Sequence, residues 1–214
     1  MMTFLPSLEV LLAFTAAAIV LVLTPGPDMT LFLGHTLTGG RARGIAAMLG
    51  ACSGVVVHTM LAAFGLSALL AASATAFGIL KIAGGAYLVW LAIDALRHGS
   101  ALTLKTEAGA PQPILRVYLT GVGINLLNPK IVMFFLTFLP QFVSASDPHA
   151  GAKMLFLGLY FNAIGIPICI ALILMADRFT AAIRRSPRAM RVVDYLFAGL
   201  MGAFAIRLWF AQNR

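Results

Sequence analysis

The sequence predicts an all-α integral membrane protein with six transmembrane helices. They form two inverted three-helix repeats, in which helices 1 and 4 are broken at the membrane midplane. Of the 214 residues, 61% are hydrophobic and 10% are charged, whereas a soluble domain has roughly 45–50% apolar and about 25% charged residues. The apolar residues form six runs, each long enough to cross a hydrocarbon core of about 30 Å. Two of these runs are interrupted by proline next to a charged residue.

The six runs define the expected spans and repeats. Their approximate limits are 8–34, 45–71, 73–97, 115–140, 153–177 and 190–211. The first run is not expected to be a cleaved signal peptide, because such a peptide needs a basic n-region and Glu9 is the charged residue near its start. We therefore expect one membrane domain, 1–214, with a first repeat at 1–97, a cytoplasmic linker at 98–114 and a second repeat at 115–214.

The positive charge is placed in alternate loops. The formal net charge is +8, and the loops after the first, third and fifth runs hold most of the basic residues. The positive-inside rule predicts that these loops face the cytoplasm, which places both termini outside. We therefore expect contact with the lipid bilayer and not with nucleic acid. The basic loop residues are Arg41, Arg43, Arg97, Lys105, Arg116, Arg178, Arg184, Arg185, Arg188 and Arg191.

The polar linker separates three runs from three runs, so the second half enters the membrane from the opposite side. Each half begins with an interrupted run, and discontinuous helices in corresponding positions mark a midplane binding site in inverted-repeat transporters. The stretch Gly50–Gly54 is a GxxxG pattern, which favours close helix packing. Such a face serves either the bundle or the contact between copies, so a homo-oligomer is left open.

The first interruption is the stretch TPGPD at 24–28. Thr24 or Gly26 can act as the cap of a new helix, and Pro25 or Pro27 suits its first turn. Gly26 also permits backbone conformations that other residues avoid. Asp28 then lies in the first turn, where the helix dipole favours a negative charge.

The second interruption is the stretch NPK at 128–130. Asn128 is a strong N-cap residue, and Pro129 suits the first helical position. The preceding segment must end near Leu127, because the residue before such a start avoids the helical region. Lys130 adds a positive charge beside the free amides of the new helix, and Asn125, three residues before Asn128, should face the same cavity.

Together the two breaks predict a site for a small zwitterion. A carboxylate fits helix N-termini, and an ammonium fits Asp28, so a free amino acid suits the site. In the alternative interpretation, the prolines only kink the helices and Asp28 forms a structural ion pair with Lys130. Two breaks in matching places favour the site, because ionisable groups inside a membrane are usually functional.

Several other polar residues are accessory candidates. His58 in the second run either relays protons or forms a hydrogen bond to a neighbouring helix. Asn162 in the fifth run either lines the pathway or packs in the bundle. Cys52 and Cys169 are the two cysteines, and the chain has no CxxC motif, so we expect neither a metal site nor a cofactor.

Three stretches resemble the LysE/RhtB family of bacterial amino-acid exporters: LTPGPDMTLFLGHTLTGGRARGIAAMLGACSG, KIAGGAYLVWLAIDALR and GVGINLLNPKIVMFFLTFLPQFV. The resemblance implies six helices in two inverted halves in the bacterial inner membrane. It also implies outward transport of amino acids or their derivatives, driven by the proton gradient, and no enzymatic activity. Carried onto this sequence, the central site comprises Pro25, Gly26, Pro27, Asp28, Asn125, Asn128, Pro129 and Lys130.

We therefore expect a secondary exporter that works by alternating access. Protonation of Asp28 would remove the countercharge of the substrate ammonium, and exchange of an Asp28–Lys130 pairing would bias the inward and outward forms. The lack of a second clear midplane acid favours a small neutral amino acid, such as homoserine, threonine or leucine, over lysine. One alternative is an inorganic-ion exporter, which needs clustered oxygen or sulfur ligands. The other is a membrane-embedded enzyme, for which His58 and Asp28 are the available acid–base pair.

Overall fold

The computed structural model describes residues 5–66, scattered positions between 79 and 97, residues 112–144 and residues 147–210. Most of the predicted third span, 73–97, and most of the linker, 98–114, therefore lie outside the described residues. The described elements are α1 (Leu8–Leu23), α2 (Pro27–Gly39), α3 (Arg41–Met60), the π-helix η1 (Leu61–Leu66), α6 (Ile114–Leu126), α7 (Pro129–Met133), the π-helix η2 (Phe134–Phe138), the 3-10 helix η3 (Leu139–Phe142), α8 (Ala150–Leu174), α9 (Ala176–Arg185) and α10 (Pro187–Phe210).

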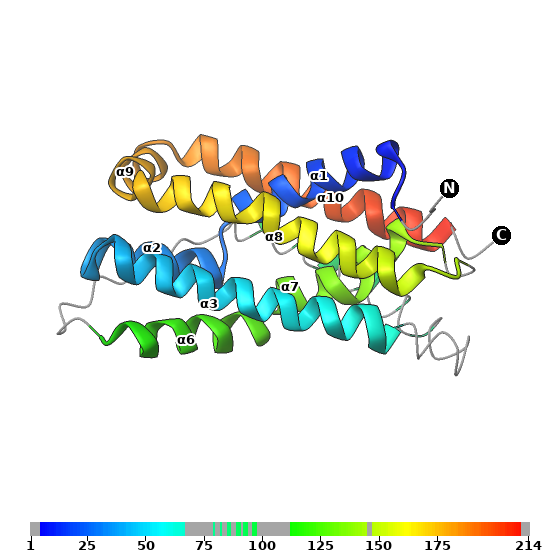
Figure 1. Ribbon diagram of the computed structural model, residues 1–214. Coiled ribbons are helices and arrows are strands. Elements are labelled where there is room, and N and C mark those ends of the chain that lie inside the picture. Colours follow the sequence, from blue (N-terminus) through cyan, green and yellow to red (C-terminus); the bar gives the residue numbers. More distant parts are fainter. Residues whose placement is uncertain are drawn as a thin grey trace.

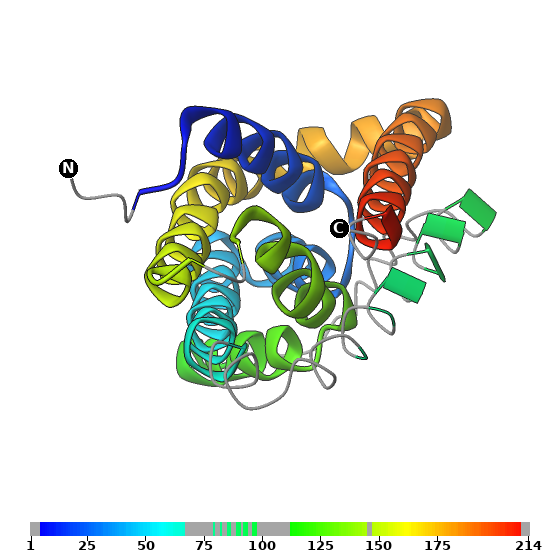
Figure 2. The same cartoon turned by 90° about the vertical axis from the view of Figure 1, so that its right-hand side faces the viewer.

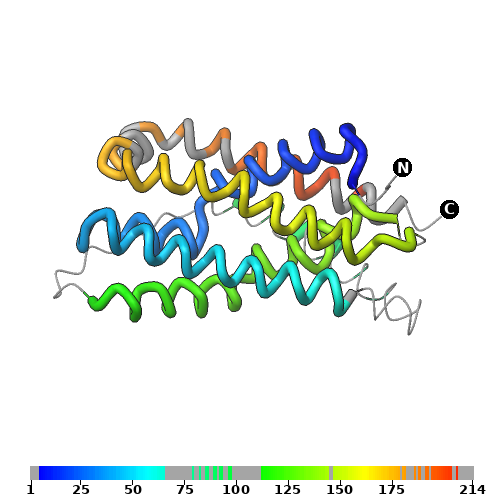
Figure 3. Tube along the Cα trace, in the orientation of Figure 1, coloured from blue at the N-terminus to red at the C-terminus, as the bar shows by residue number. Residues whose placement is uncertain are grey.

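Most of the helices lie side by side along one axis (Figure 1). The α1–α2 pair runs in one direction and the α6–α7 pair runs in the other, so the two broken segments are antiparallel. The view along the bundle in Figure 2 shows α1, α8, α3 and α6 around α2 and the segment that runs from α7 to η3. The trace in Figure 3 shows that both helix breaks lie near the middle of the long axis of the bundle.

The described part of the chain contains two to four membrane spans by length and composition. Arg41–Gly65 and Ala150–Leu174 are each long and apolar enough to cross a bilayer. The α1–α2 pair is bent by 53°, and the pair formed by Ile114–Leu126 and Pro129–Phe142 is bent by 50°; each pair reaches the required length when it is counted as one span. The chain is therefore a multi-pass helical membrane protein.

Residues 178–189, expected to form a basic loop, instead contain most of a further helix, α9. It lies at the same end of the bundle as the turn between α2 and α3 and the start of α6 (Figure 1). Two arginines tie these parts together, since Arg41 donates to the carbonyl of Leu174 at 3.3 Å and Arg43 donates to that of Gln112 at 2.8 Å. An arginine at the carbonyl end of α8 also complements the helix dipole.

Small residues allow α3 and α6 to pack backbone to backbone. A Cβ atom on Gly50 would lie 2.1 Å from the carbonyl oxygen of Tyr118, and one on Gly121 would lie 2.3 Å from that of Ala47. Side chains larger than hydrogen therefore cannot be placed at these two positions without separating the helices. The GxxxG pattern that begins at Gly50 thus serves packing within the chain.

Two buried apolar clusters lie on either side of the helix breaks. The first joins α1, the segment α7–η3 and α8, and it is dominated by stacked and edge-on aromatic rings. The second joins α2, the first half of α3, α6 and the end of α8. The buried aromatic members of the first cluster are Phe14, Phe134, Phe135, Phe138, Phe142, Phe161 and Phe197, and the second includes Met29, Phe32, Leu33 and Met48.

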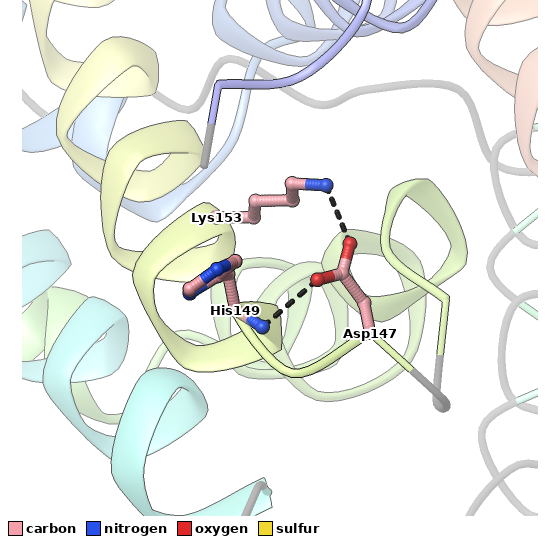
Figure 4. A network of polar contacts seen from close by, with 3 residues as sticks. All are labelled: Asp147, His149 and Lys153. Atoms are coloured by element: carbon pink, nitrogen blue, oxygen red, sulfur yellow. Dashed lines mark hydrogen bonds and ion pairs between the residues drawn. The ribbon is translucent and has the colours of Figure 1, made fainter. Parts of the chain in front are cut away.

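A small polar network lies at the N-terminus of α8 (Figure 4). One carboxylate oxygen of Asp147 accepts a hydrogen bond from the backbone N–H of His149 at 2.8 Å. The other forms an ion pair with the ammonium of Lys153. The hydrogen bond from Lys153, followed by that from His149, holds the pKa of Asp147 below its ordinary value of 3.8. The carboxylate form of Asp147 therefore supports the start of α8.

Replacement of this carboxylate is expected to cause a small, pH-dependent loss of stability. A depressed folded-state pKa stabilises the fold above the unfolded value of 3.8, and this contribution is lost as the pH falls through the folded value. The Asp147→Asn protein should therefore melt at a lower temperature than the parent at neutral pH and at the same temperature well below pH 3.8. Thermal unfolding of both proteins in detergent, from neutral pH to well below pH 3.8, checks this prediction. A difference in melting temperature that persists at the acid end would contradict the stabilising role of the Asp147 carboxylate.

Candidate functional site

The first break has the local structure that its residues predict. Thr24 closes α1, since its backbone N–H donates to the carbonyl of Val20 at 2.9 Å and its hydroxyl donates to the same carbonyl at 2.7 Å. Gly26 is the N-cap of α2 in an extended conformation, and Pro27 is the first helical residue. Of the two caps that the sequence allows, Gly26 is therefore the one used, and it provides no side chain to cover the amides of α2.

The second break confirms the predicted helix start. Helix α6 ends at Leu126, and α7 begins at Pro129 with Asn128 as its N-cap. The side-chain oxygen of Asn128 accepts a hydrogen bond from the backbone N–H of Lys130 at 3.1 Å. This cap takes up an amide that was expected to face the midplane, so the N-terminus of α7 is less open than that of α2.

The first break contributes a carboxylate that is bound by the second break. Asp28 is the second residue of α2, and its Oδ2 accepts hydrogen bonds from the side-chain amides of Asn125 at 2.8 Å and Asn128 at 3.0 Å. Asn125 and Asn128 are almost fully buried. The structure thus brings Asp28 together with both asparagines, whose spacing places them on the same side of the break.

The second break contributes an ammonium that is bound by the first. Lys130 is the second residue of α7, and its Nζ donates to the carbonyl of Thr24 at 2.8 Å and to that of Leu21 at 3.3 Å. Each break therefore binds the charged side chain of the other.

A pairing of Asp28 with Lys130, which the sequence left open, is not present in this conformation. Within the described ranges, no hydrogen bond or ion pair joins the two side chains. The reason is that both charged groups have neutral partners on the opposite break: amide groups for Asp28 and backbone carbonyls for Lys130.

A cavity of about 70 Å³, measured as space open to the centres of water molecules, adjoins the breaks. Since one water needs about 10–15 Å³ of such space, the cavity has room for roughly five waters or one small organic molecule. It lies between the two apolar clusters and receives residues from both. Its lining residues are Leu21, Val22, Thr24, Asp28, Met29, Phe32, Met48, Ala51, Cys52, Val55, Asn125, Lys130, Ile131, Phe161, Asn162, Gly165 and Cys169.

The cavity wall holds a buried acceptor without a partner. Oδ1 of Asp28 is shielded from solvent and has no hydrogen bond. Oδ1 of Asn125 is also unpartnered, but it packs against Gly54, where an added Cβ would lie 2.4 Å away. A buried carboxylate oxygen without a partner is costly, so Asp28 is the group of this wall that most needs a cationic or hydrogen-donating ligand.

The other predicted residues have different positions. Pro25, Pro27 and Pro129 shape the breaks without lining the cavity. His58 is buried next to the site; its Nε2 lies 3.3 Å from the carbonyl oxygen of Asn125, and its ring stacks on Phe135. A carbonyl oxygen only accepts, so Nε2 is the donor.

Asn162 lines the cavity and bridges α8 to α3 by donating to the carbonyl of Cys52 at 3.1 Å. The sequence left open whether Asn162 lines the pathway or packs in the bundle; the structure shows that it lines the cavity and also packs against α3.

The sequence did not single out the apolar part of the wall. The apolar lining residues include Met29, Phe32, Met48, Val55 and Phe161. No sequence pattern in their helices distinguishes the residues that line the cavity from those of the apolar core. In the described part of the chain, no group of three His, Cys, Asp or Glu residues is placed to hold a metal ion. The site therefore combines one acid, amide groups and one lysine with an apolar pocket.

The family model for the LysE type translocator matches residues 19–212. The chain is 31% identical to the homoserine/homoserine lactone efflux protein of Salmonella typhimurium over 88% of this chain and 90% of that protein. It is 32% identical to an uncharacterized membrane protein of Vibrio cholerae over 90% of this chain and 93% of that protein. No solved structure matches.

Proposed function

Because the chain belongs to the LysE type translocator family, we propose that it is a proton-coupled exporter of small neutral amino acids in the bacterial inner membrane. The observation that carries the proposal is the unpartnered carboxylate oxygen of Asp28 in the wall of a cavity beside two helix breaks. The efflux function in the name of the Salmonella relative supports the outward direction.

In this proposal the cavity binds the two ends of an amino acid differently. The ammonium group binds Oδ1 of Asp28, while Oδ2 keeps its bonds to the asparagines. The carboxylate lies toward the N-terminus of α2, where Gly26 gives no side-chain cap and the amides and helix dipole attract an anion. The side chain fits against the apolar wall, which includes Phe32 and Phe161, so an uncharged side chain is favoured over that of lysine.

Proton coupling follows from competition for the same oxygen. A proton on Asp28 removes the charge that holds the substrate ammonium, so proton and substrate exclude each other. Because either ligand changes the charge where the two breaks meet, each biases the balance between inward-open and outward-open forms. Release of the substrate outside and of the proton inside then completes a cycle of export.

The proposed arrangement has six spans in two inverted halves, one domain over 1–214 and the basic loops in the cytoplasm. The antiparallel course of the two broken segments supports the inversion. The gathering of Arg41, Arg43 and α9 at one end of the bundle supports the sidedness. The central site comprises the residues of both breaks together with Asn125, and Asn162 is accessory. His58 acts by holding the carbonyl of Asn125.

Uptake into inverted membrane vesicles tests the proposal. Vesicles that contain the protein should accumulate a subset of labelled amino acids, with small neutral ones such as homoserine, threonine and leucine first, and collapse of the pH gradient should abolish the accumulation. Vesicles without the protein are the control. If no amino acid accumulates while inorganic ions do, an ion exporter replaces the proposal. If substrate is consumed without reappearing, an enzyme replaces it.

A further inference from the structure

Lys130 fills a gap in the hydrogen bonding of α1 that Pro25 creates. In a helix the carbonyl of Leu21 would accept from the amide of residue 25, but proline has no N–H. The ammonium of Lys130 donates to that carbonyl at 3.3 Å, and to the carbonyl of Thr24, which lies in the break, at 2.8 Å. Two of its three hydrogens are therefore committed to the backbone of the first break.

The surroundings of this ammonium fit a permanent contact. Thr24 is buried, and a carbonyl left unpaired there would be costly. The C-terminal end of a helix carries partial negative charge, so a cation is favoured at the end of α1. At Gly26 an added Cβ would lie 3.2 Å from Nζ, so the ammonium lies directly against the backbone of the break.

We propose that Lys130 is a positioning residue that replaces the missing amide of Pro25 and ties the first break to the start of α7. Asn128 precedes it by two residues and bonds Asp28, so the tie also fixes the carboxylate in the cavity. Lys130 is accordingly not the group that recognises the carboxylate of the substrate. The statement about substrate recognition rests on the proposed export function. The structural tie between the two breaks does not depend on that function.

A double-mutant cycle on the purified full-length protein tests the tie without any transport measurement. Pro25→Ala restores an amide at residue 25 and also frees Thr24, which is extended in the break, to become helical, so that the new amide can donate to Leu21. We expect Lys130→Met to lower the melting temperature clearly in the parent and by much less in the Pro25→Ala background, because coupled groups give non-additive changes. Equal decreases in both backgrounds would overturn the tie. If Lys130→Met alone does not fold, Pro25→Ala should restore folding in the double variant, and failure to do so would also overturn the tie.

A transport ratio separates positioning from substrate recognition. In inverted vesicles, the maximum rate of Lys130→Met should fall by about tenfold or more, as expected for the loss of charged hydrogen bonds. The ratio of uptake of an amino acid to that of its methyl ester should stay as in the parent. A ratio that moves toward one would identify Lys130 as the carboxylate ligand and overturn the assignment.

The matched control is Lys153→Met, which removes the ammonium that pairs with Asp147 at the N-terminal end of α8. It should keep both the rate and the ratio. If the parent protein transports no amino acid, the export proposal fails, and the double-mutant cycle still decides whether Lys130 forms the tie.

Discussion

Asp28→Asn is expected to abolish gradient-driven uptake while leaving the fold intact. The carbonyl of the new asparagine can still accept the hydrogen bonds from Asn125 and Asn128 that Oδ2 accepts at 2.8 and 3.0 Å. The negative charge, however, is lost, and with it the group that takes up either a proton or an ammonium. Loss of a charged hydrogen bond costs roughly 1.5–3 kcal/mol, or about 10- to 100-fold in substrate affinity. Because the coupling step is also removed, no uptake against a gradient should remain.

The measurement is accumulation of the best labelled amino acid in inverted vesicles, with the pH gradient imposed and then collapsed. Asp177→Asn is the matched control, since Asp177 is exposed on α9 and lies outside the cavity. It should accumulate substrate as the parent does. Melting temperatures of both variants near that of the parent would show that Asp28→Asn acts on transport. Full-rate accumulation by the Asp28→Asn protein would refute the coupling role of this carboxylate.

The positions of the helix breaks could be predicted because they depend on local chemistry. Proline cannot donate an amide hydrogen, and asparagine caps a helix wherever its side chain reaches the first free amides. The end of α1, the start of α2, the end of α6 and the start of α7 follow from these rules. The contact of Asn125 and Asn128 with one partner follows from their spacing, which places both at the same break.

The partners of the two charged residues could not be predicted in the same way. From sequence, opposite charges at matching positions favour an ion pair, and backbone carbonyls leave no trace in a composition or motif. The need of Leu21 for a donor arises from Pro25 and is met by a residue more than a hundred positions later, Lys130. Only the packing of the two breaks against each other shows that backbone carbonyls are the hydrogen-bond partners of the Lys130 ammonium.

Packing also decides which apolar residues form the cavity. Met48 and Val55 are interchangeable with their neighbours by hydropathy, and their place in the wall depends on how α3 meets α6 and α8. Helix α9 was missed because its arginines fitted the expectation of a basic loop, although charged residues also suit a helix at a membrane surface. Most of the third span and most of the linker lie outside the described residues, so the predictions for them stand as predictions.

Gly54→Ala is expected to inactivate transport from a position outside the cavity wall. An added Cβ would lie 2.4 Å from Oδ1 of Asn125 and 2.8 Å from its Cβ, which is too close for any side-chain contact. Asn125 is 1% exposed, so its side chain can move away from the new methyl group only toward the adjoining cavity, and this movement breaks its bond to Asp28. Overpacking of this kind costs typically about 1–3 kcal/mol of stability, and the displaced carboxylate should lower the uptake rate by about tenfold or more.

The control for this prediction is Gly123→Ala, since a Cβ at Gly123 meets nothing within 4 Å and the residue is two positions from Asn125 on the same helix. It should transport as the parent does. The pair Gly54→Ala and Asn125→Gly separates crowding from function: the double variant should recover part of the lost melting temperature, because all the clashing side-chain atoms of residue 125 are gone, but not the uptake rate, because the amide that holds Asp28 is also gone. Recovery of both would mean that Asn125 matters to this protein only as a packing element. Normal uptake by Gly54→Ala alone would mean that the contact between Asn125 and Asp28 is not needed at all.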